Sequence, residues 1–232
     1  MQYPNLIGPT FVPGKGIQAP VVFFDDFFGD QPVVSKSALA APWLQTDETG
    51  TSVLGIAVAD ADGGAFEFDT GTTAASDVSI QLQDEPFLMN TGRHLYFESK
   101  LKVETVALSS AMFGMSVIDA TPFAGFPANF VGFTMDTDAD LEIRSIASAG
   151  GDSGDLDTGT DLVADTYVTL GMQWDGTSKV HFFADGVHVY TYSTLANIPY
   201  GVNLTPLFGI KVTSTTAAKL TIDYVYVMND RD

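Results

Sequence analysis

The chain has 232 residues, 45% of them hydrophobic and 12% aromatic, which is enough apolar material for a sizeable core and excludes a disordered protein. Its formal net charge is −19, from 29 acidic and 10 basic residues, so it repels phosphate backbones and we exclude nucleic acid as a partner. Because there is no cysteine, we also exclude a disulfide framework, thiolate metal sites and thiol catalysis.

Residues 1–20 carry four prolines and three glycines without sustained periodicity, which predicts an extended N-terminal arm. The arm lacks a basic region followed by a continuous apolar run, so we expect no signal peptide, and no apolar run in the chain is long enough to span a membrane. Disorder is one interpretation of the arm, whereas its apolar residues favour docking on a neighbouring subunit. These residues are Tyr3, Leu6, Ile7, Phe11, Val12 and Ile17.

From residue 21 onward, short apolar runs are separated by Gly, Asp, Thr or Pro, which is typical of strands joined by turns. Helical periodicity is nearly absent. We predict strands at residues 21–24, 52–58, 65–68, 78–82, 94–103, 111–117, 129–135, 141–146, 167–174, 180–184, 187–192, 206–213 and 218–227. The pattern indicates an all-β fold, a two-sheet antiparallel β-sandwich, formed by one domain over residues 21–232.

For two of these strands the sequence also predicts which faces are buried. The strand at 94–103 alternates apolar and polar residues, which predicts that one face is buried and the other solvated. The strand at 218–227 is apolar on both sides, with Leu220, Ile222, Tyr224 and Tyr226 opposing Val225 and Val227. We therefore expect it in the middle of a sheet.

The dipeptide Asp185-Gly186 predicts a tight two-residue hairpin turn, because both residues tolerate the positive φ that such a turn needs. With this turn at the tip, the pairs are Ala184 with Val187, Phe183 with His188, Phe182 with Val189, His181 with Tyr190 and Val180 with Thr191. One face of the hairpin then gathers His181, Phe183, His188, Tyr190 and Tyr192. Such a face fits a glycan platform, a subunit contact or plain core.

Several segments carry a resemblance to a known family: Phe23 to Phe27, Trp43, Tyr96 to Leu101, the hairpin Val180 to Gly186, and Ile222 to Val227. In this order they resemble the concanavalin A-like lectin/glucanase jelly roll, and more narrowly the laminin-G-like domains of tailed-bacteriophage structural proteins. The resemblance implies two curved sheets. It also implies either glycan binding, as in the lectins, or an oligomeric role as a capsid decoration module.

Glucanases of this fold use the strand motif Glu-x-Asp-x-x-Glu, because two carboxylates must flank the bond that they cleave. The chain has no such triplet. The nearest candidates are Glu98 with Glu104 and Asp140 with Glu142, and neither pair has a third carboxylate at the right spacing. Glu98 and Glu104 fall on the same face of one strand, but six residues separate them by about 20 Å. We therefore predict no catalytic residues and expect that the protein is not an enzyme.

Calcium is the one cofactor that the sequence suggests. Asp136, Asp138 and Asp140 alternate as in a calcium loop, but Leu141 and Ala147 stand where an EF-hand needs glycine and glutamate. Turn formation is the favoured interpretation of the three aspartates, with a bound calcium ion as the alternative.

The leading hypothesis is a non-enzymatic virion structural protein, a capsid decoration or head-associated protein on the capsid surface. Its partners would be the major capsid protein and other copies of itself, in a homo-oligomer such as a trimer, with the N-terminal arm helping to dock it. Outside a virion we expect a soluble protein without affinity for membranes. The alternative is a carbohydrate-binding, lectin-like module that adheres to host or surface glycans.

Overall fold

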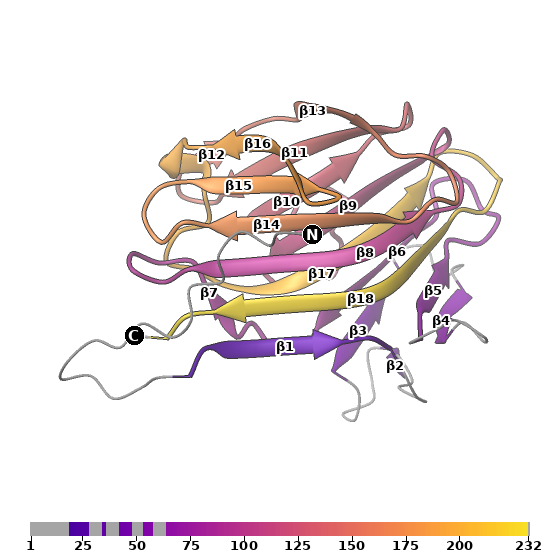
Figure 1. Ribbon diagram of the computed structural model, residues 1–232. Coiled ribbons are helices and arrows are strands. Elements are labelled where there is room, and N and C mark those ends of the chain that lie inside the picture. Colours follow the sequence, from indigo (N-terminus) through magenta and orange to yellow (C-terminus); the bar gives the residue numbers. More distant parts are fainter. Residues whose placement is uncertain (1–18, 28–33, 36–41, 48–52, 58–63, 232) are drawn as a thin grey trace.

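The computed structural model describes residues 19–27, 34–35, 42–47, 53–57 and 64–231. Within these ranges the regular structure is almost wholly β, and one short 3₁₀ turn, η1 (Leu195–Asn197), interrupts it. The strands form two sheets that lie face to face (Figure 1). Among the described residues no helix is long and apolar enough to cross a membrane.

The first sheet, here called sheet A, contains both strands of the predicted hairpin. Its order is β16 (Val187–Tyr192), β15 (Val180–Ala184), β14 (Val168–Trp174), β8 (Leu95–Val103), β18 (Lys219–Asn229), β5 (Phe66–Asp69) and β4 (Val53–Ala57), and β1 (Val21–Asp25) also pairs with β18. The pairings within sheet A are antiparallel.

The second sheet, sheet B, lies opposite. Its order is β12 (Gly151–Asp152), β11 (Asp140–Ala147), β10 (Phe130–Met135), β9 (Ser109–Ser116), β17 (Asn203–Val212), β6 (Asp77–Leu82), β3 (Trp43–Thr46) and β2 (Val34–Ser35), while β13 (Leu156–Asp161) pairs with β11 and β7 (Phe87–Leu88) with β17. Apart from the short parallel pair β2–β3, these pairings are antiparallel. The two-sheet antiparallel jelly-roll sandwich is therefore confirmed.

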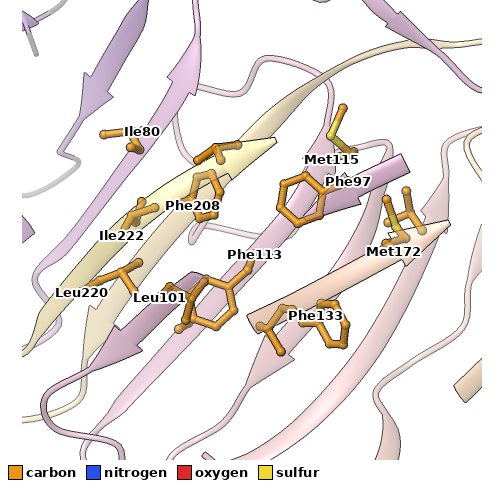
Figure 2. Packing of buried hydrophobic residues seen from close by; sticks show 14 of the residues in the cluster. Ile80, Phe97, Leu101, Phe113, Met115, Phe133, Met172, Phe208, Leu220 and Ile222 are labelled. Carbon is orange, nitrogen blue, oxygen red and sulfur yellow. The ribbon is translucent and has the colours of Figure 1, made fainter. Parts of the chain in front are cut away.

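The core lies between the two sheets and is rich in aromatic rings (Figure 2). Phe97 of sheet A meets Phe208 of sheet B with ring centroids 5.9 Å apart, and Phe133 meets Phe182 edge to face at 5.3 Å. All four rings are fully buried. Burial of such large apolar side chains, at about 25 cal/mol per Å² of area, is the main force that holds the sheets together.

The segments that carried the family resemblance contribute buried residues to the core, whereas Phe24 within them is exposed. Trp43 is buried against Phe208, and its indole N–H donates a 2.8 Å hydrogen bond to the carboxylate of Asp25. The other oxygen of that carboxylate accepts the backbone N–H of Phe27. The Phe-Phe-Asp-Asp-Phe sequence thus ties β1 of sheet A to β3 of sheet B.

Every predicted strand is present, with its ends within three residues of the prediction. The alternation in β8 is confirmed, because buried and half-buried residues alternate along its full length. The structure adds β2, β3, β7, β12 and β13, which are short or, in β13, polar and largely exposed. The arm residues Tyr3, Leu6, Ile7, Phe11, Val12 and Ile17 lie outside the described residues, so their docking stays a prediction.

The hairpin turn at Asp185-Gly186 is confirmed, since both residues have positive φ, 48° and 75°. The predicted register is correct for the first two pairs and wrong beyond them. A β-bulge lies between the pairs of Phe183 and Phe182, so Phe182 pairs with Tyr190, and Val180 pairs with Tyr192. This one-residue shift turns both tyrosines toward the core side, where Tyr192 is buried.

A second bulge, in the last strand, changes which of its residues face the core. The pairing of β18 with β8 shifts between Ile222 and Tyr224, so Val225 joins Leu220 and Ile222 in the core. Tyr224 is displaced to the solvent side, where its hydroxyl donates to Glu98. The predicted central position of the strand is confirmed, because β18 lies between β8 on one side and β1 and β5 on the other.

Candidate functional site

The face of sheet B that points away from the core is partly covered by the loop at residues 117–129, between β9 and β10. Under this loop lies a small second core, in which Met112, Phe130 and Leu207 are buried and Phe123 packs against them. The rings of Phe126 and Phe130 are 6.1 Å apart. The loop is thus held on the sheet by its aromatic side chains.

A pocket of about 270 Å³ opens beside this loop, over the neighbouring ends of β9, β10 and β11. Phe123 and Phe126 line one part of it, and three carboxylates, those of Asp136, Glu142 and Asp155, line another. Because Phe126 is among the exposed large apolar residues, we call this cavity the Phe126 pocket. It combines aromatic faces with hydrogen-bonding groups, the usual composition of a small-molecule site.

Glu142 projects into the Phe126 pocket from β11, where it pairs with Thr134 of β10. Partial burial raises the pKa of its carboxyl, and the negative charges of Asp155 and Asp136 raise it further. Among the described residues, neither a hydrogen bond nor an ion pair to its carboxylate is found. Glu142 therefore holds its proton to higher pH than an ordinary glutamate and has its oxygens available to a ligand.

Arg144, two residues further along β11, organises the wall of the pocket. It donates to both oxygens of Asp152, at 3.0 and 2.5 Å, and to Asp155 at 2.8 Å. Its guanidinium lies 3.9 Å from the ring centroid of Phe126. Burial would raise the pKa of Asp152, but the hydrogen bonds from Arg144 and from the backbone N–H of Gly154, together with the charge of Arg144, outweigh burial and lower the pKa. One arginine thus fixes both a carboxylate and an aromatic ring of the pocket.

The predicted hairpin face is only partly assembled. His181 and His188 come together, with ring centroids 5.9 Å apart, and both bond to the hydroxyl of Thr191 at 2.9 and 2.7 Å. Phe183 packs edge to face on His188. Tyr190 and Tyr192 leave this face because of the bulge, so the predicted set of five does not form one platform. Burial, and then the nearby His188, lower the pKa of His181.

The calcium candidates lie in the turn between β10 and β11. Asp136 accepts the backbone N–H of Thr137 at 2.8 Å, and Asp138 accepts that of Asp140 at 3.3 Å. The negative charge of Asp138 raises the pKa of Asp140. Across the ranges that the structure covers, no group of three His, Cys, Asp or Glu side chains is placed to hold a metal ion. Calcium binding at this turn stays a prediction without geometric support.

Of the carboxylates considered from the sequence, Glu142 lines the Phe126 pocket, whereas Glu98 lies elsewhere. Both oxygens of Glu98 accept tyrosine hydroxyls, from Tyr96 and from Tyr224, on the outer face of sheet A. The outward positions of β10 are Phe130, Gly132 and Thr134, so no row of carboxylates follows that strand. The acids of the Phe126 pocket, Asp136, Glu142 and Asp155, come instead from three separate segments, so a search for a motif along one strand finds Glu142 but does not group it with the other two.

We compared the chain with known proteins. No protein-family model and no curated protein sequence matches it. Among solved structures it is similar to a protein of unknown function from Shewanella oneidensis MR-1, with 15% identity, a TM-score of 0.64 and 94% and 92% of the two chains covered. It is also similar to an endo-1,3-beta-glucanase from Streptomyces sioyaensis, with 16% identity, a TM-score of 0.61 and 92% and 97% of the two chains covered. A third similar structure is a glycoside hydrolase family 16 endo-glucanase from Bacteroides ovatus, with 16% identity, a TM-score of 0.61 and 88% and 99% of the two chains covered.

These matches correct the functional expectations. The expected non-enzymatic virion structural protein is contradicted, since several of the similar structures are named as glycan-cleaving enzymes, among them glucanases and O-glycanases, and nothing in the comparisons indicates a capsid. The expectation that the chain is not an enzyme is contradicted by the same matches. The lectin-like alternative agrees with these matches better than the virion hypothesis does. At this level of identity the likeness itself establishes the concanavalin A-like jelly-roll fold.

Proposed function

We propose that this chain is a carbohydrate-active protein that binds a glycan in the Phe126 pocket. The observation that carries the proposal is the arrangement of Phe126 and Phe123 beside the carboxylates of Asp136 and Glu142. A sugar ring has apolar C–H faces and a rim of hydroxyl groups. The aromatic rings suit the faces and the carboxylates accept from the hydroxyls, so this combination fits a saccharide.

The comparisons support the chemical class of the ligand. Several similar structures bear names that refer to glucans, including a laminarinase catalytic domain from Thermotoga maritima and a mixed-linkage glucan enzyme from Bacteroides ovatus. We therefore propose a β-glucan as the first ligand to test. A neutral glycan also suits a chain with a net charge of −19, which repels sulfated and uronic-acid polymers.

Binding can be tested by calorimetry with laminarin and mixed-linkage β-glucan, together with a glycan array. Phe126→Ala removes the exposed aromatic wall and should weaken binding about tenfold, equivalent to about 1.4 kcal/mol. Phe183→Ala is the matched control, because it removes a half-exposed ring on sheet A, outside the pocket. Loss of binding in Phe183→Ala with retention in Phe126→Ala would move the site to the hairpin. Absence of glycan binding by the unaltered protein would refute the proposal.

A second candidate function is glycoside hydrolysis at the same pocket. The observation that favours it is the raised pKa of Glu142 beside other carboxylates. A carboxyl that keeps its proton can donate it to the leaving oxygen of a glycosidic bond, while an ionised neighbour supports the developing positive charge or activates water. Asp136 and Asp155 are the neighbours that raise this pKa by their charge.

Hydrolysis can be tested by release of reducing sugar from laminarin and mixed-linkage β-glucan. If Glu142 is the proton donor, Glu142→Gln should lower the rate at least about 100-fold, whereas the exposed Glu104→Gln should retain it. Equal activity of the Glu142→Gln variant and the unaltered protein would exclude Glu142 from this role. Binding without turnover would support the glycan-binding proposal and refute the proposal of hydrolysis.

A further inference from the structure

The outer face of sheet B contains a row of residues that would form the floor of a groove across the sheet. Strand pairing places Glu142, Thr134, Met112, Gly209, Ser79 and Thr46 next to one another in successive strands. Beyond Met112 the residues of this row, Gly209, Ser79 and Thr46, are small, and Ser79 and Thr46 are buried, so the row is covered in the ligand-free protein. The Phe126 pocket lies at the Glu142 end.

Phe123 of the 117–129 loop interrupts this row. Its ring lies directly on Gly209, so that a Cβ atom added at Gly209 would be only 2.8 Å from Phe123 Cε2. The glycine is therefore the residue that lets the ring approach the sheet. Phe123 also lines the Phe126 pocket, so the same ring borders the pocket and covers Gly209.

The loop is anchored in a way that makes it a fixed wall. The buried side chain of Gln81 in β6 donates to the carbonyl of Val117 at 3.0 Å and accepts the N–H of Asp119 at 3.0 Å. Near the middle of the loop, Lys211 donates to the carbonyl of Phe123 at 3.3 Å. Buried, satisfied hydrogen bonds of this kind resist opening. The loop therefore closes the row in the ligand-free protein.

We propose that the Phe126 pocket receives the end of a saccharide chain, and that Phe123 prevents the interior of a chain from crossing the sheet. The inference rests on the proposed glycan-binding function. The volume of about 270 Å³ lies just under the range of roughly 300–1,000 Å³ that is usual for ligand pockets, so it suits a terminal sugar and part of its neighbour. The similar endo-acting enzymes, by their names, act within chains.

The test compares ligands that have ends with one that has none. The probes are laminaritriose, laminarihexaose and a cyclic β-glucan of the same glucose units, measured by calorimetry on the full chain. A pocket for chain ends should bind the trimer and the hexamer within about twofold of each other, because the additional sugars find no further contacts, and should not bind the cyclic glucan. Cyclic glucan bound as tightly as the hexamer would overturn the inference while leaving glycan binding intact.

Phe123→Ala provides the second arm, because it uncovers Gly209 and should open the row. In this variant the hexamer should bind at least about fivefold more tightly than the trimer, and the cyclic glucan should gain binding. Phe183→Ala, outside the pocket, should retain the pattern of the unaltered protein. A Phe123→Ala variant with unchanged chain-length dependence would show that the ring does not limit the site. If none of the three probes binds to the unaltered protein, glycan binding and the chain-end inference fail together.

Discussion

Close approach between β9 and β10 depends on two glycines that face each other, Gly114 and Gly132. A Cβ atom added at Gly132 would lie 2.3 Å from the carbonyl oxygen of Phe113 and 2.8 Å from the Cα atom of Gly114. Both of these are backbone atoms, which cannot rotate away. The floor beside the Phe126 pocket is therefore built on residues without side chains.

We expect Gly132→Ala to destabilise the protein by about 2 kcal/mol or more, because the strands must separate to admit the methyl group. The measurement is urea unfolding followed by tryptophan fluorescence. Gly125→Ala, in the loop above, is the matched control, since a Cβ atom there meets nothing within 4 Å. Equal midpoints for the two variants would contradict the close approach.

The carboxyl of Glu142 should reduce stability at neutral pH. Burial, and then the charges of Asp155 and Asp136, raise its pKa in the folded protein, so the folded state binds its proton more tightly than the unfolded state. Stability then falls as the pH rises from the ordinary glutamate pKa through the raised one, and the full penalty persists above it. The sign is opposite to that of a salt-bridged acid.

Glu142→Gln should therefore be more stable than the unaltered protein at pH 7, by a modest amount of about 0.5 kcal/mol because solvent screens part of the effect. The gain should disappear below the ordinary glutamate pKa of about 4.3, where both states are protonated. Thermal unfolding at pH 7 and pH 3.5 measures it. A stability loss at pH 7 would show that the carboxylate has a stabilising partner.

Among the elements, the turn between β14 and β15 is fixed by one side chain. The carboxylate of Asp175 accepts the backbone N–H groups of Thr177, Ser178 and Lys179 at 2.7, 2.8 and 3.0 Å. Burial would raise its pKa, but these three hydrogen bonds outweigh burial and lower it. Asp175 thus replaces the backbone partners that a tight turn cannot supply.

Asp175→Ala should cost about 1–2 kcal/mol at pH 7, since three N–H groups lose their acceptor. Because the folded-state pKa is lowered, this contribution is present above the ordinary aspartate pKa of about 3.9 and is lost as the pH falls through the lowered value. The difference in unfolding free energy between variant and unaltered protein should therefore shrink below pH 4. Asp185→Asn, in the next turn, removes the charge of a carboxylate that accepts one described N–H, that of Thr169, keeps a residue that tolerates the positive φ of 48°, and should cost less.

Sequence periodicity predicted the strands well and their faces less well, and the bulges explain the difference. Alternation in β8 runs without interruption, and its buried face was predicted correctly. In β16 and β18 a bulge changes the phase, and no residue type at Val189 or Asp223 marks the position. A bulge depends on the twist and pairing of neighbouring strands, which a single strand's pattern does not contain.

At the scale of the whole molecule, the fold was predictable and the function was not. Many of the residues that carry the resemblance, among them Trp43, Phe97 and Val225, lie in the core, and Asp185 and Gly186 form a turn, so they specify the sandwich and not its ligand. The Phe126 pocket is assembled from a loop, the ends of β9, β10 and β11, Lys211 of β17 and the approach to β13. Phe123 and Phe126 within a Pro/Gly-rich loop were the one local signal for it, and their meeting with Glu142 depends on tertiary structure.

The net charge of −19 on 24.7 kDa leads to a prediction for the molecule as a whole. Like charges that are brought together on folding repel one another, and the described ion pairs, such as Lys100–Asp223 and Lys219–Glu67, neutralise only some of the acids. Raising NaCl from about 10 mM to about 500 mM shortens the Debye length from roughly 30 Å to under 8 Å, so this repulsion is largely screened. We expect the Tm to rise by about 2–4 °C, equivalent to about 1 kcal/mol in a chain of this size. Sucrose of equal osmolality is the control for exclusion effects, and a Tm that falls with salt would mean that the ion pairs outweigh the repulsion.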